Sequence, residues 1–486
     1  MLFNSIGFLA FFTIIVAVYY RLDHSQRWKL LLAGSYYFYM CWRPAYIILI
    51  IISTLIDYYC GLGMGKASDN KKRKLYLILS LCSNLGLLFT FKYLNFFGWT
   101  VKCFLGYSQV EAAAPILNVL LPVGISFYTF QKLSYIIDVY RRNIAPEKRL
   151  GIFALYVSFF PQLVAGPIER STRLIPQFDN RVKFNYNCVA SGLKLMLWGM
   201  FKKVVIADNL SQFVEPVYSN PASFAGPSFV IATVFFAFQI YCDFSGYTDI
   251  AIGSARVLGF DLMKNFNRPY FARSITEFWR RWHISLSTWF RDYLYIPLGG
   301  NRVRPTRNYI NLFIVFVLCG LWHGANWTFV IWGTLHGLYL VFEKLTSGRR
   351  ASLAKNLSLE KIGPLLKVLQ VLITFALVCF AWIFFRAKNL DDAWYIVTHL
   401  LSGWDSVLIA HDLQPVLILG SYKFFVTTLI LIGLMETVHL IQRKGSVMEI
   451  LNQKPIWLRW SVYYLLVIGI MLLGNFNSQE FIYFQF

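Results

Sequence analysis

The sequence FWRRWHISLSTWFRD (Phe278–Asp292), followed by CGLWHGANW (Cys319–Trp327) and GTLHG (Gly333–Gly337), decides how this chain is interpreted. These segments belong to one stretch that runs from Phe266 to Gly337. Its first half combines cations, aromatic rings and hydroxyl groups. Its second half places two histidines inside apolar sequence. The remainder of the chain has the pattern of a membrane scaffold around this stretch.

The composition indicates a polytopic membrane protein. Of 486 residues, 57% are hydrophobic and only 14% are charged, whereas a soluble domain carries roughly 25% charged residues. The formal net charge is +22, and most Lys and Arg residues lie in short loops between apolar runs, as expected for cytoplasmic loops. This distribution favours membrane topology over nucleic-acid binding.

Apolar runs of about the length of a membrane crossing recur along the whole chain, and residues 308–343 hold two apolar stretches interrupted at Trp322–Asn326, with basic residues on both flanks. The runs lie at residues 4–20, 30–42, 45–64, 76–98, 115–138, 187–207, 228–242, 308–343, 366–386, 415–439 and 457–474. We expect an all-α protein with about eleven transmembrane helices. Basic segments at residues 65–75 and 141–149 place those loops in the cytoplasm and the N-terminus outside.

Two segments depart from a simple crossing. Residues 151–168 contain two prolines and two glycines between basic flanks, which favours a re-entrant segment that lines a cavity. Residues 264–307 are rich in Arg and aromatic residues. If this block were one helix, Trp279, Trp282 and Leu286 would share a face, as in a helix that lies in the membrane interface.

His323 and His336 are the clearest candidates for chemistry. Each precedes the second glycine of a Gly-x-x-x-Gly pattern, Gly320/Gly324 and Gly333/Gly337, a spacing that lets helices approach closely. Ionisable side chains buried in the membrane are functional candidates by default. On one continuous helix the two histidines would lie on different faces, so they are not expected to act as a pair of ligands.

Several classes of site can be compared from the residues alone. The eight cysteines are scattered without a C-x-x-C pair, so no metal site is expected. Ser285 and Ser287 near His283 lack a Gly-x-Ser-x-Gly setting. A lone buried imidazole suits general-base catalysis on a hydroxyl group, and the Arg-rich block suits an anionic donor. A proton-coupled transporter would also use buried histidines and carboxylates, so that class stays open from the residues alone.

Long motifs link the chain to a known family. They are PVGISFYTFQ (Pro122–Gln131), PQLVAGPI (Pro161–Ile168), DFSGYTD (Asp243–Asp249), the block through His283, the Trp322-His323-Gly324 segment and FIYFQF (Phe481–Phe486). Over nearly its whole length the chain resembles the membrane-bound O-acyltransferases (MBOATs), in the bacterial branch of alginate and peptidoglycan O-acetylases. D-alanyl transferases are more distant members of the same family.

The resemblance implies a fold and a reaction. It implies a single integral membrane domain over residues 1–486, with a catalytic core at about 115–343, flanking helices at 1–114 and 344–486, re-entrant helices and a central tunnel. An acetyl group from a cytoplasmic thioester, acetyl-CoA or another acyl thioester, would cross the bacterial inner membrane for O-acetylation of an exported or cell-wall polysaccharide. No bound cofactor is expected.

The resemblance also implies partners and site residues. The expected partners are the bilayer, an extracytoplasmic SGNH-type acetyltransferase, the polysaccharide and, for some donors, an acyl carrier protein. His323 matches the catalytic histidine of the family and His283 its second functional histidine. Residues expected to bind donor or substrate are Arg280, Arg281, Arg291, Trp279, Trp322, Asp243, Ser245, Asn326 and His336. The alternatives are D-alanyl transfer from a carrier protein and a transporter of acyl groups or glycans without bond chemistry.

Overall fold

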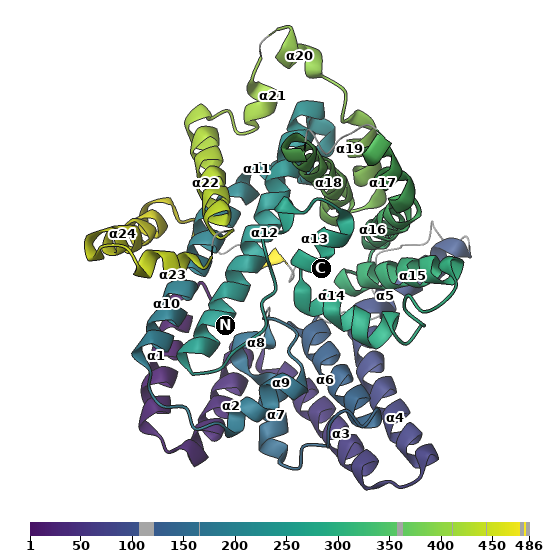
Figure 1. Cartoon of the computed structure of the whole chain (residues 1–486), viewed down its shortest axis with the longest axis vertical. Coiled ribbons are helices and arrows are strands. Elements are labelled where there is room, and N and C mark those ends of the chain that lie inside the picture. Colours follow the sequence, from purple (N-terminus) through teal and green to yellow (C-terminus); the bar gives the residue numbers. More distant parts are fainter. Residues whose placement is uncertain are drawn as a thin grey trace. The chain divides into compact units, whose positions relative to one another are not determined.

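A computed structural model describes residues 1–105, 121–164, 166–356, 363–410, 412–443, 445–476 and 481–482. Within these ranges every regular element is a helix, so the all-α prediction is confirmed (Figure 1). The described residues group into two compact units, residues 1–196 with 247–264 and residues 197–246 with 265–486. The expectation of one integral domain over the whole chain stays a prediction.

The first unit contains the N-terminal helices. They are α1 (Ile6–Arg21), α2 (His24–Met40), α3 (Ile47–Lys66), α4 (Asn70–Leu88), α5 (Leu94–Phe104), α6 (Ile125–Tyr140), α7 (Leu150–Ser158), α8 (Phe160–Leu163), α9 (Ser171–Leu174) and most of α10 (Tyr186–Met200). A π-helical turn, η2 (Phe89–Tyr93), joins α4 to α5.

The second unit contains the C-terminal helices and the stretch Phe266–Gly337. They are α11 (Asp208–Ser219), α12 (Gly226–Val257), α13 (Ile275–Arg281), α14 (Ile284–Phe290), α15 (Pro305–His323), α16 (Trp327–Leu345), α17 (Ser347–Asn356), α18 (Gly363–Arg386), α19 (Leu390–His399), α20 (Trp404–Leu408), α21 (Gln414–Leu417), α22 (Tyr422–Ile441), α23 (Val447–Asn452) and α24 (Ile456–Leu473). The π-helical segments η4 (Phe201–Ala207) and η7 (Arg291–Tyr295) precede α11 and follow α14. The end of α12, from Tyr247 onward, packs with the first unit.

Six helices among the described residues are long and apolar enough to cross a membrane. They span Pro44–Lys66, Asn70–Lys102, Gly226–Val257, Gly363–Arg386, Tyr422–Ile441 and Ile456–Leu473. The chain is therefore a multi-pass membrane protein. The count of about eleven crossings stays a prediction, because helices such as α1 and α6, with 16 residues each, are shorter than the ~20 residues that a straight crossing needs.

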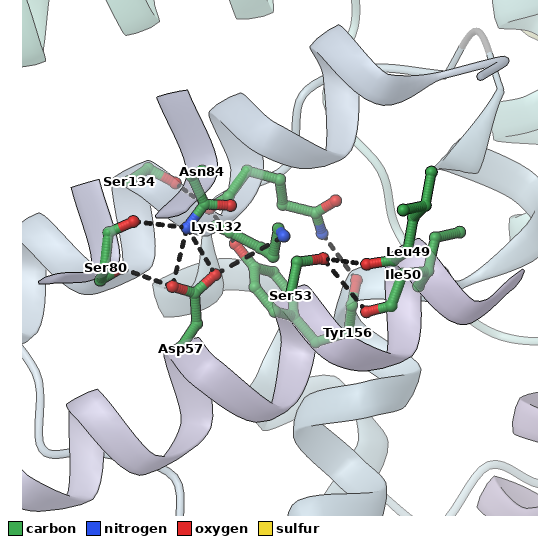
Figure 2. Close-up of polar contacts among 10 residues, drawn as sticks. Leu49, Ile50, Ser53, Asp57, Ser80, Asn84, Lys132, Ser134 and Tyr156 are labelled. Carbon is green, nitrogen blue, oxygen red and sulfur yellow. Dashed lines mark hydrogen bonds and ion pairs between the residues drawn. The ribbon is translucent and has the colours of Figure 1, made fainter. Parts of the chain in front are cut away.

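A buried polar cluster joins α3, α4 and α6 in the first unit (Figure 2). Asp57 of α3 accepts hydrogen bonds from Ser80 and from Asn84 Nδ2, the latter at 2.8 and 2.9 Å. Lys132 Nζ of α6 lies 3.6 Å from Asp57 Oδ2, and both side chains are fully buried. Charged groups in apolar surroundings are costly unless they are paired and hydrogen-bonded. The pair therefore holds the three helices in one arrangement.

The predicted re-entrant segment forms two short, buried helices, α7 and α8, of nine and four residues. Nine helical residues extend about 14 Å, roughly half of a ~30 Å hydrocarbon core, which agrees with a segment that does not cross. Gln131 Nε2 of α6 and Gln162 Nε2 of α8 both donate to the Tyr156 carbonyl oxygen, at 2.6 and 2.8 Å. The lining of a cavity by this segment stays a prediction.

The boundary of the predicted crossing at residues 228–242 is wrong, because α12 continues to Val257 and contains the whole DFSGYTD motif. Polar groups in the middle of this helix find partners on η4. Lys203 Nζ lies 2.9 Å from Asp243 Oδ1, and Lys202 Nζ donates to Ser245 Oγ at 2.8 Å. The sequence shows two carboxylates after an apolar run but does not show these distant partners.

The interpretation of the Arg-rich block as one continuous helix is also wrong. The block folds as α13 and α14, which are separated at Trp282 and His283. His283 has φ +42°, in the left-handed region, which an α-helix cannot contain. Because of this break, the side chains of α13 and α14 do not share one continuous helical face, and His283 belongs to neither helix.

Candidate functional site

Asn265 and the turn at His283 position the first histidine. The Asn265 carbonyl oxygen accepts from the backbone N–H of Ile284 at 2.9 Å, and Asn265 Oδ1 accepts from Ser285 Oγ at 2.7 Å. The same Oδ1 lies 3.3 Å from His283 Nδ1. An amide oxygen only accepts hydrogen bonds, so Nδ1 carries the proton in this contact. The left-handed conformation of His283 is sparsely populated, and such strain clusters at functional sites.

His323 ends α15, and aromatic rings enclose its imidazole. The ring centroids of Trp322 and Trp332 both lie 4.9 Å from that of His323, and the Phe385 centroid lies 5.3 Å away. The side chain is buried, with 3% exposed. The His283 centroid lies 6.5 Å from that of His323, and the Trp322 ring also contacts His283 at 5.9 Å. The structure therefore brings together the two histidines that the resemblance singled out.

His336 lies one aromatic ring away from His323. Helix α15 ends at His323 and α16 begins at Trp327, so the two histidines belong to the antiparallel helices α15 and α16. Trp332 contacts both, at 4.9 and 5.0 Å. Trp279 Nε1 donates to His336 Nδ1 at 3.2 Å, which leaves Nε2 as the protonated nitrogen of the neutral ring. His323 and His336 therefore do not lie on different faces of one helix, because the helix is not continuous between them.

Two glycines bring α15 and α16 into backbone contact. A Cβ atom on Gly320 would lie 2.2 Å from the Phe329 carbonyl oxygen, and one on Gly333 would lie 2.3 Å from the Phe316 carbonyl oxygen. The predicted close approach of helices at these glycines is confirmed. It fixes the position of His323 relative to Trp332.

A cavity of about 860 Å³ lies beside this cluster. Trp279, which contacts His336, and Cys319, one helical turn before His323, contribute to its lining. The lining also includes four cationic side chains, Arg280, Arg291, Lys344 and Arg350. An elongated, anionic molecule that enters this cavity would reach within one turn of His323 with its phosphate groups near cations.

Arg281 has a different environment from Arg280 and Arg291, since it does not line the cavity. Its guanidinium pairs with Glu277, and it also donates to the Arg268 carbonyl oxygen at 3.4 Å. Burial alone would raise the pKa of Glu277. The Arg273 N–H and the Arg281 guanidinium outweigh this effect, so the pKa lies below its ordinary value. Arg281 is thus engaged in an ion pair within α13.

The other predicted site residues make structural contacts. Asn326 caps α16 by accepting from the Thr328 N–H at 3.1 Å, and its amide donates to the Lys388 carbonyl oxygen at 3.0 Å. Ser245 contacts Lys202, as described above. Asp243 accepts from the backbone N–H of Ile482 at 2.8 Å.

The C-terminal segment reaches the histidines through one ring. Phe481 is fully buried and its centroid lies 5.8 Å from that of Phe244, which in turn lies 4.7 Å from His283. The closing motif thus contributes to the surroundings of His283. Its last four residues, 483–486, lie outside the described residues.

Sequence reasoning missed Asn265, Phe244 and Phe385, which contact the two histidines. Phe244 belongs to the DFSGYTD motif, but no sequence signal predicts these contacts, because they depend on the turn at His283 and on the packing of α12 and α18. Among the side chains that the structure describes, no three His, Cys, Asp or Glu residues gather to hold a metal ion.

Comparisons with known proteins identify the relatives of this chain. A model of the MBOAT, membrane-bound O-acyltransferase family, matches residues 46–385. The chain is 40% identical over 410 residues to the probable alginate O-acetylase AlgI of Azotobacter vinelandii, covering 84% of this chain and 79% of that protein. It is 35% identical over 521 residues to the peptidoglycan O-acetyltransferase of Helicobacter pylori, covering 100% of this chain and 95% of that protein.

A more distant relative is the teichoic acid D-alanyltransferase of Streptococcus thermophilus, 29% identical over 308 residues, covering 59% of this chain and 72% of that protein. The family model extends over well more than half of the chain and includes the cavity and all three histidines. The chain therefore belongs to the membrane-bound O-acyltransferase family.

Proposed function

We propose that this chain moves an acetyl group from a cytoplasmic thioester across the bacterial inner membrane, for O-acetylation of an exported or cell-wall polysaccharide. The observation that carries the proposal is the paired placement of His283 and His323, whose ring centroids lie 6.5 Å apart. His323 lies one helical turn from Cys319, which lines a cavity that has cationic side chains in its wall. The names of the alginate and peptidoglycan relatives support acetyl as the transferred group.

The cavity suits the donor. Acetyl-CoA and carrier-bound acyl groups share a thioester at the end of a phosphopantetheine arm. Arg280 and Arg291, both exposed and both in the cavity lining, would bind the phosphates through charge-assisted hydrogen bonds. Trp279 would form the wall beside the arm. Arg281 contributes less directly, because Glu277 already engages it. No resident cofactor is needed for this chemistry.

His323 would act as the general base. It takes the proton of the acceptor hydroxyl as that oxygen attacks the thioester carbonyl carbon. A carbon–oxygen bond forms, the carbon–sulfur bond breaks, and the departing thiolate takes up the proton. The reaction thus yields an ester and a free thiol without net proton release. His283, oriented by Asn265, would position His323 or the donor carbonyl, with Trp322 in contact with both imidazoles.

Outside the cytoplasm, the acceptor would be the polysaccharide or an SGNH-type acetyltransferase that passes the acetyl group on. An acyl carrier protein would be needed if the donor is not free acetyl-CoA. Transfer of D-alanine is the second candidate, because the teichoic acid D-alanyltransferase of S. thermophilus matches 59% of the chain. A transporter without bond chemistry is disfavoured, since the relatives are named as acyl-transferring enzymes.

The proposal can be tested in the source bacterium. A strain that lacks this chain is complemented with wild type or with His323→Ala, and ester-linked acetate and D-alanine are measured on the exported and cell-wall polymers. We expect wild type alone to restore acetate. Restoration of D-alanine instead would favour the second candidate, and full restoration of acetate by His323→Ala would contradict the catalytic role.

A further inference from the structure

Three aromatic rings pack against the imidazole of His323. Trp322, Trp332 and Phe385 have ring centroids 4.9, 4.9 and 5.3 Å from that of His323. They are almost completely buried, with 3%, 0% and 1% of their surfaces exposed. The lining of the cavity includes Trp279 and Cys319 but none of these three rings. The rings therefore contact His323 without lining the cavity, and Trp332 packs against the cavity-lining Trp279 at 5.8 Å.

The rings cannot move apart without disturbing further packing. Trp332 stacks on Trp382 at 5.8 Å with 17° between the planes, and Phe385 contacts Phe329 at 4.9 Å. Phe385 also contacts Trp332 at 5.2 Å. The backbone contact between Gly320 and Gly333 prevents α15 and α16 from sliding. Closely packed protein interiors resist the insertion of even one methylene group.

The position of the rings determines what they would contact. A thioester carbonyl that reaches His323 from the cavity has its pantetheine arm behind it, in the cavity. Because the three rings pack against this imidazole, the acyl tail beyond the carbonyl would lie against them. An acetyl tail is a single methyl group. A longer tail would have to displace Phe385 or Trp332.

We infer that Phe385 and Trp332 determine acyl-chain length and restrict this site to acetyl-sized groups. The inference rests on the proposed function, because it assumes that the donor reaches His323 through the cavity. It assigns a specificity role to two residues outside the cavity lining. A single methylene group in an apolar pocket changes discrimination by about 10- to 200-fold, so a rigid aromatic wall can exclude butyryl and longer chains.

The test compares chain-length preference in Phe385→Ala, Phe385→Leu and Trp332→Phe with the wild type. Phe384→Leu is the matched control, because Phe384 is a neighbouring buried phenylalanine on α18 and its ring contacts that of Phe380. Acetyl-CoA, butyryl-CoA and hexanoyl-CoA serve as donors, and kcat/KM is measured for each. Thermal midpoints in detergent identify any variant that fails to fold.

We expect Phe385→Ala to raise the butyryl-to-acetyl ratio of kcat/KM at least about tenfold, the lower limit of one-methylene discrimination. Phe385→Leu should give a smaller rise, and Phe384→Leu none. The inference is overturned if folded Phe385 and Trp332 variants keep the wild-type ratio. Loss of turnover with every donor in folded variants would also overturn it, since the rings would then serve chemistry rather than selection.

A binding measurement separates this inference from the proposed function. S-ethyl and S-hexyl thioethers of phosphopantetheine carry the chain without reacting, and both donor classes share this arm. The affinity of wild type should fall steeply from ethyl to hexyl, and that of Phe385→Ala should fall less. If wild type shows no acetyl transfer, the proposed function fails, whereas the ratio of affinities still decides the inference. Equal ratios in the two proteins, or no binding of either thioether, would contradict it.

Discussion

The imidazoles of His283 and His323 lie 6.5 Å apart, and the indole of Trp322 contacts both. Each histidine occupies a break in helical structure: His283 separates α13 from α14 with φ +42°, and His323 is the last residue of α15. At these positions the side chains are placed by their own contacts, the Asn265 side chain for His283 and aromatic rings for His323, rather than by helical periodicity. This explains how two distant histidines converge on one aromatic cluster.

Removal of the base should abolish transfer. His323→Ala is expected to reduce kcat by about 10²- to 10⁴-fold, the usual contribution of a general base, while donor binding in the cavity persists. Measurement of kcat and of donor affinity in the purified protein checks this. A parallel fall in affinity would instead mean that His323 mainly binds the donor.

Loss of the Asn265 side chain should affect the orientation of His283. Asn265→Ala removes contacts to His283 Nδ1 and Ser285 Oγ. If the bond to His283 lowers the activation free energy by ~1.4 kcal/mol, its loss reduces kcat about tenfold, and KM changes little. Asn265→Asp retains the acceptor oxygen and should recover part of the rate. Equal loss in both variants would point to a folding defect, which a thermal midpoint would reveal.

The arginine side chains that line the cavity should strengthen donor binding without changing the rate of the chemical step. Arg280→Ala and Arg291→Ala are each expected to raise the KM for the thioester donor by about 10- to 100-fold, the equivalent of one charge-assisted hydrogen bond. Arg281→Ala is the matched control, since Arg281 pairs with Glu277 and does not line the cavity. A larger rise in KM for Arg281→Ala than for Arg280→Ala would contradict this assignment.

Neutralising one member of the Asp57–Lys132 pair should destabilise the protein. Asp57→Leu or Lys132→Met leaves one buried charge without its counter-ion, and the expected loss in unfolding free energy is about 3–5 kcal/mol. The double variant should lose less than either single variant. Thermal or denaturant unfolding in detergent checks the order. If the double variant were the least stable, the pair would not act as a unit.

The contact between Asp243 and the C-terminal segment should influence His283. Asp243→Asn weakens the ion pair with Lys203 and the bond to the Ile482 N–H, and Phe481→Ala removes the ring behind Phe244. Both are expected to lower kcat more than donor affinity, because Phe244 packs on His283. Unchanged turnover in Phe481→Ala would show that the segment does not position this histidine.

The class of fold could be predicted from sequence because it depends on composition and apolar run length. The long motifs indicated the family, and the glycine spacing around His323 and His336 predicted the close helix contact that Gly320 and Gly333 make. These features are local, so the sequence displays them directly.

Non-local packing could not be predicted in the same way. The left-handed turn at His283 is set by Asn265 and by the bonds around it. The continuation of α12 through Asp243 depends on Lys203, which lies on η4. The wall formed by Phe385 depends on where α18 packs. In each case the deciding partner is far along the chain and has no distinctive sequence signature.

The central claim is that His323 catalyses acetyl transfer from a thioester. The most direct measurement uses purified protein in liposomes with radiolabelled acetyl-CoA, comparing wild type, His323→Ala and the control Phe384→Leu. We predict CoA release and loss of acetyl label from the donor with wild type and Phe384→Leu, and neither with folded His323→Ala. Equal CoA release and acetyl transfer by His323→Ala and wild type would contradict the account.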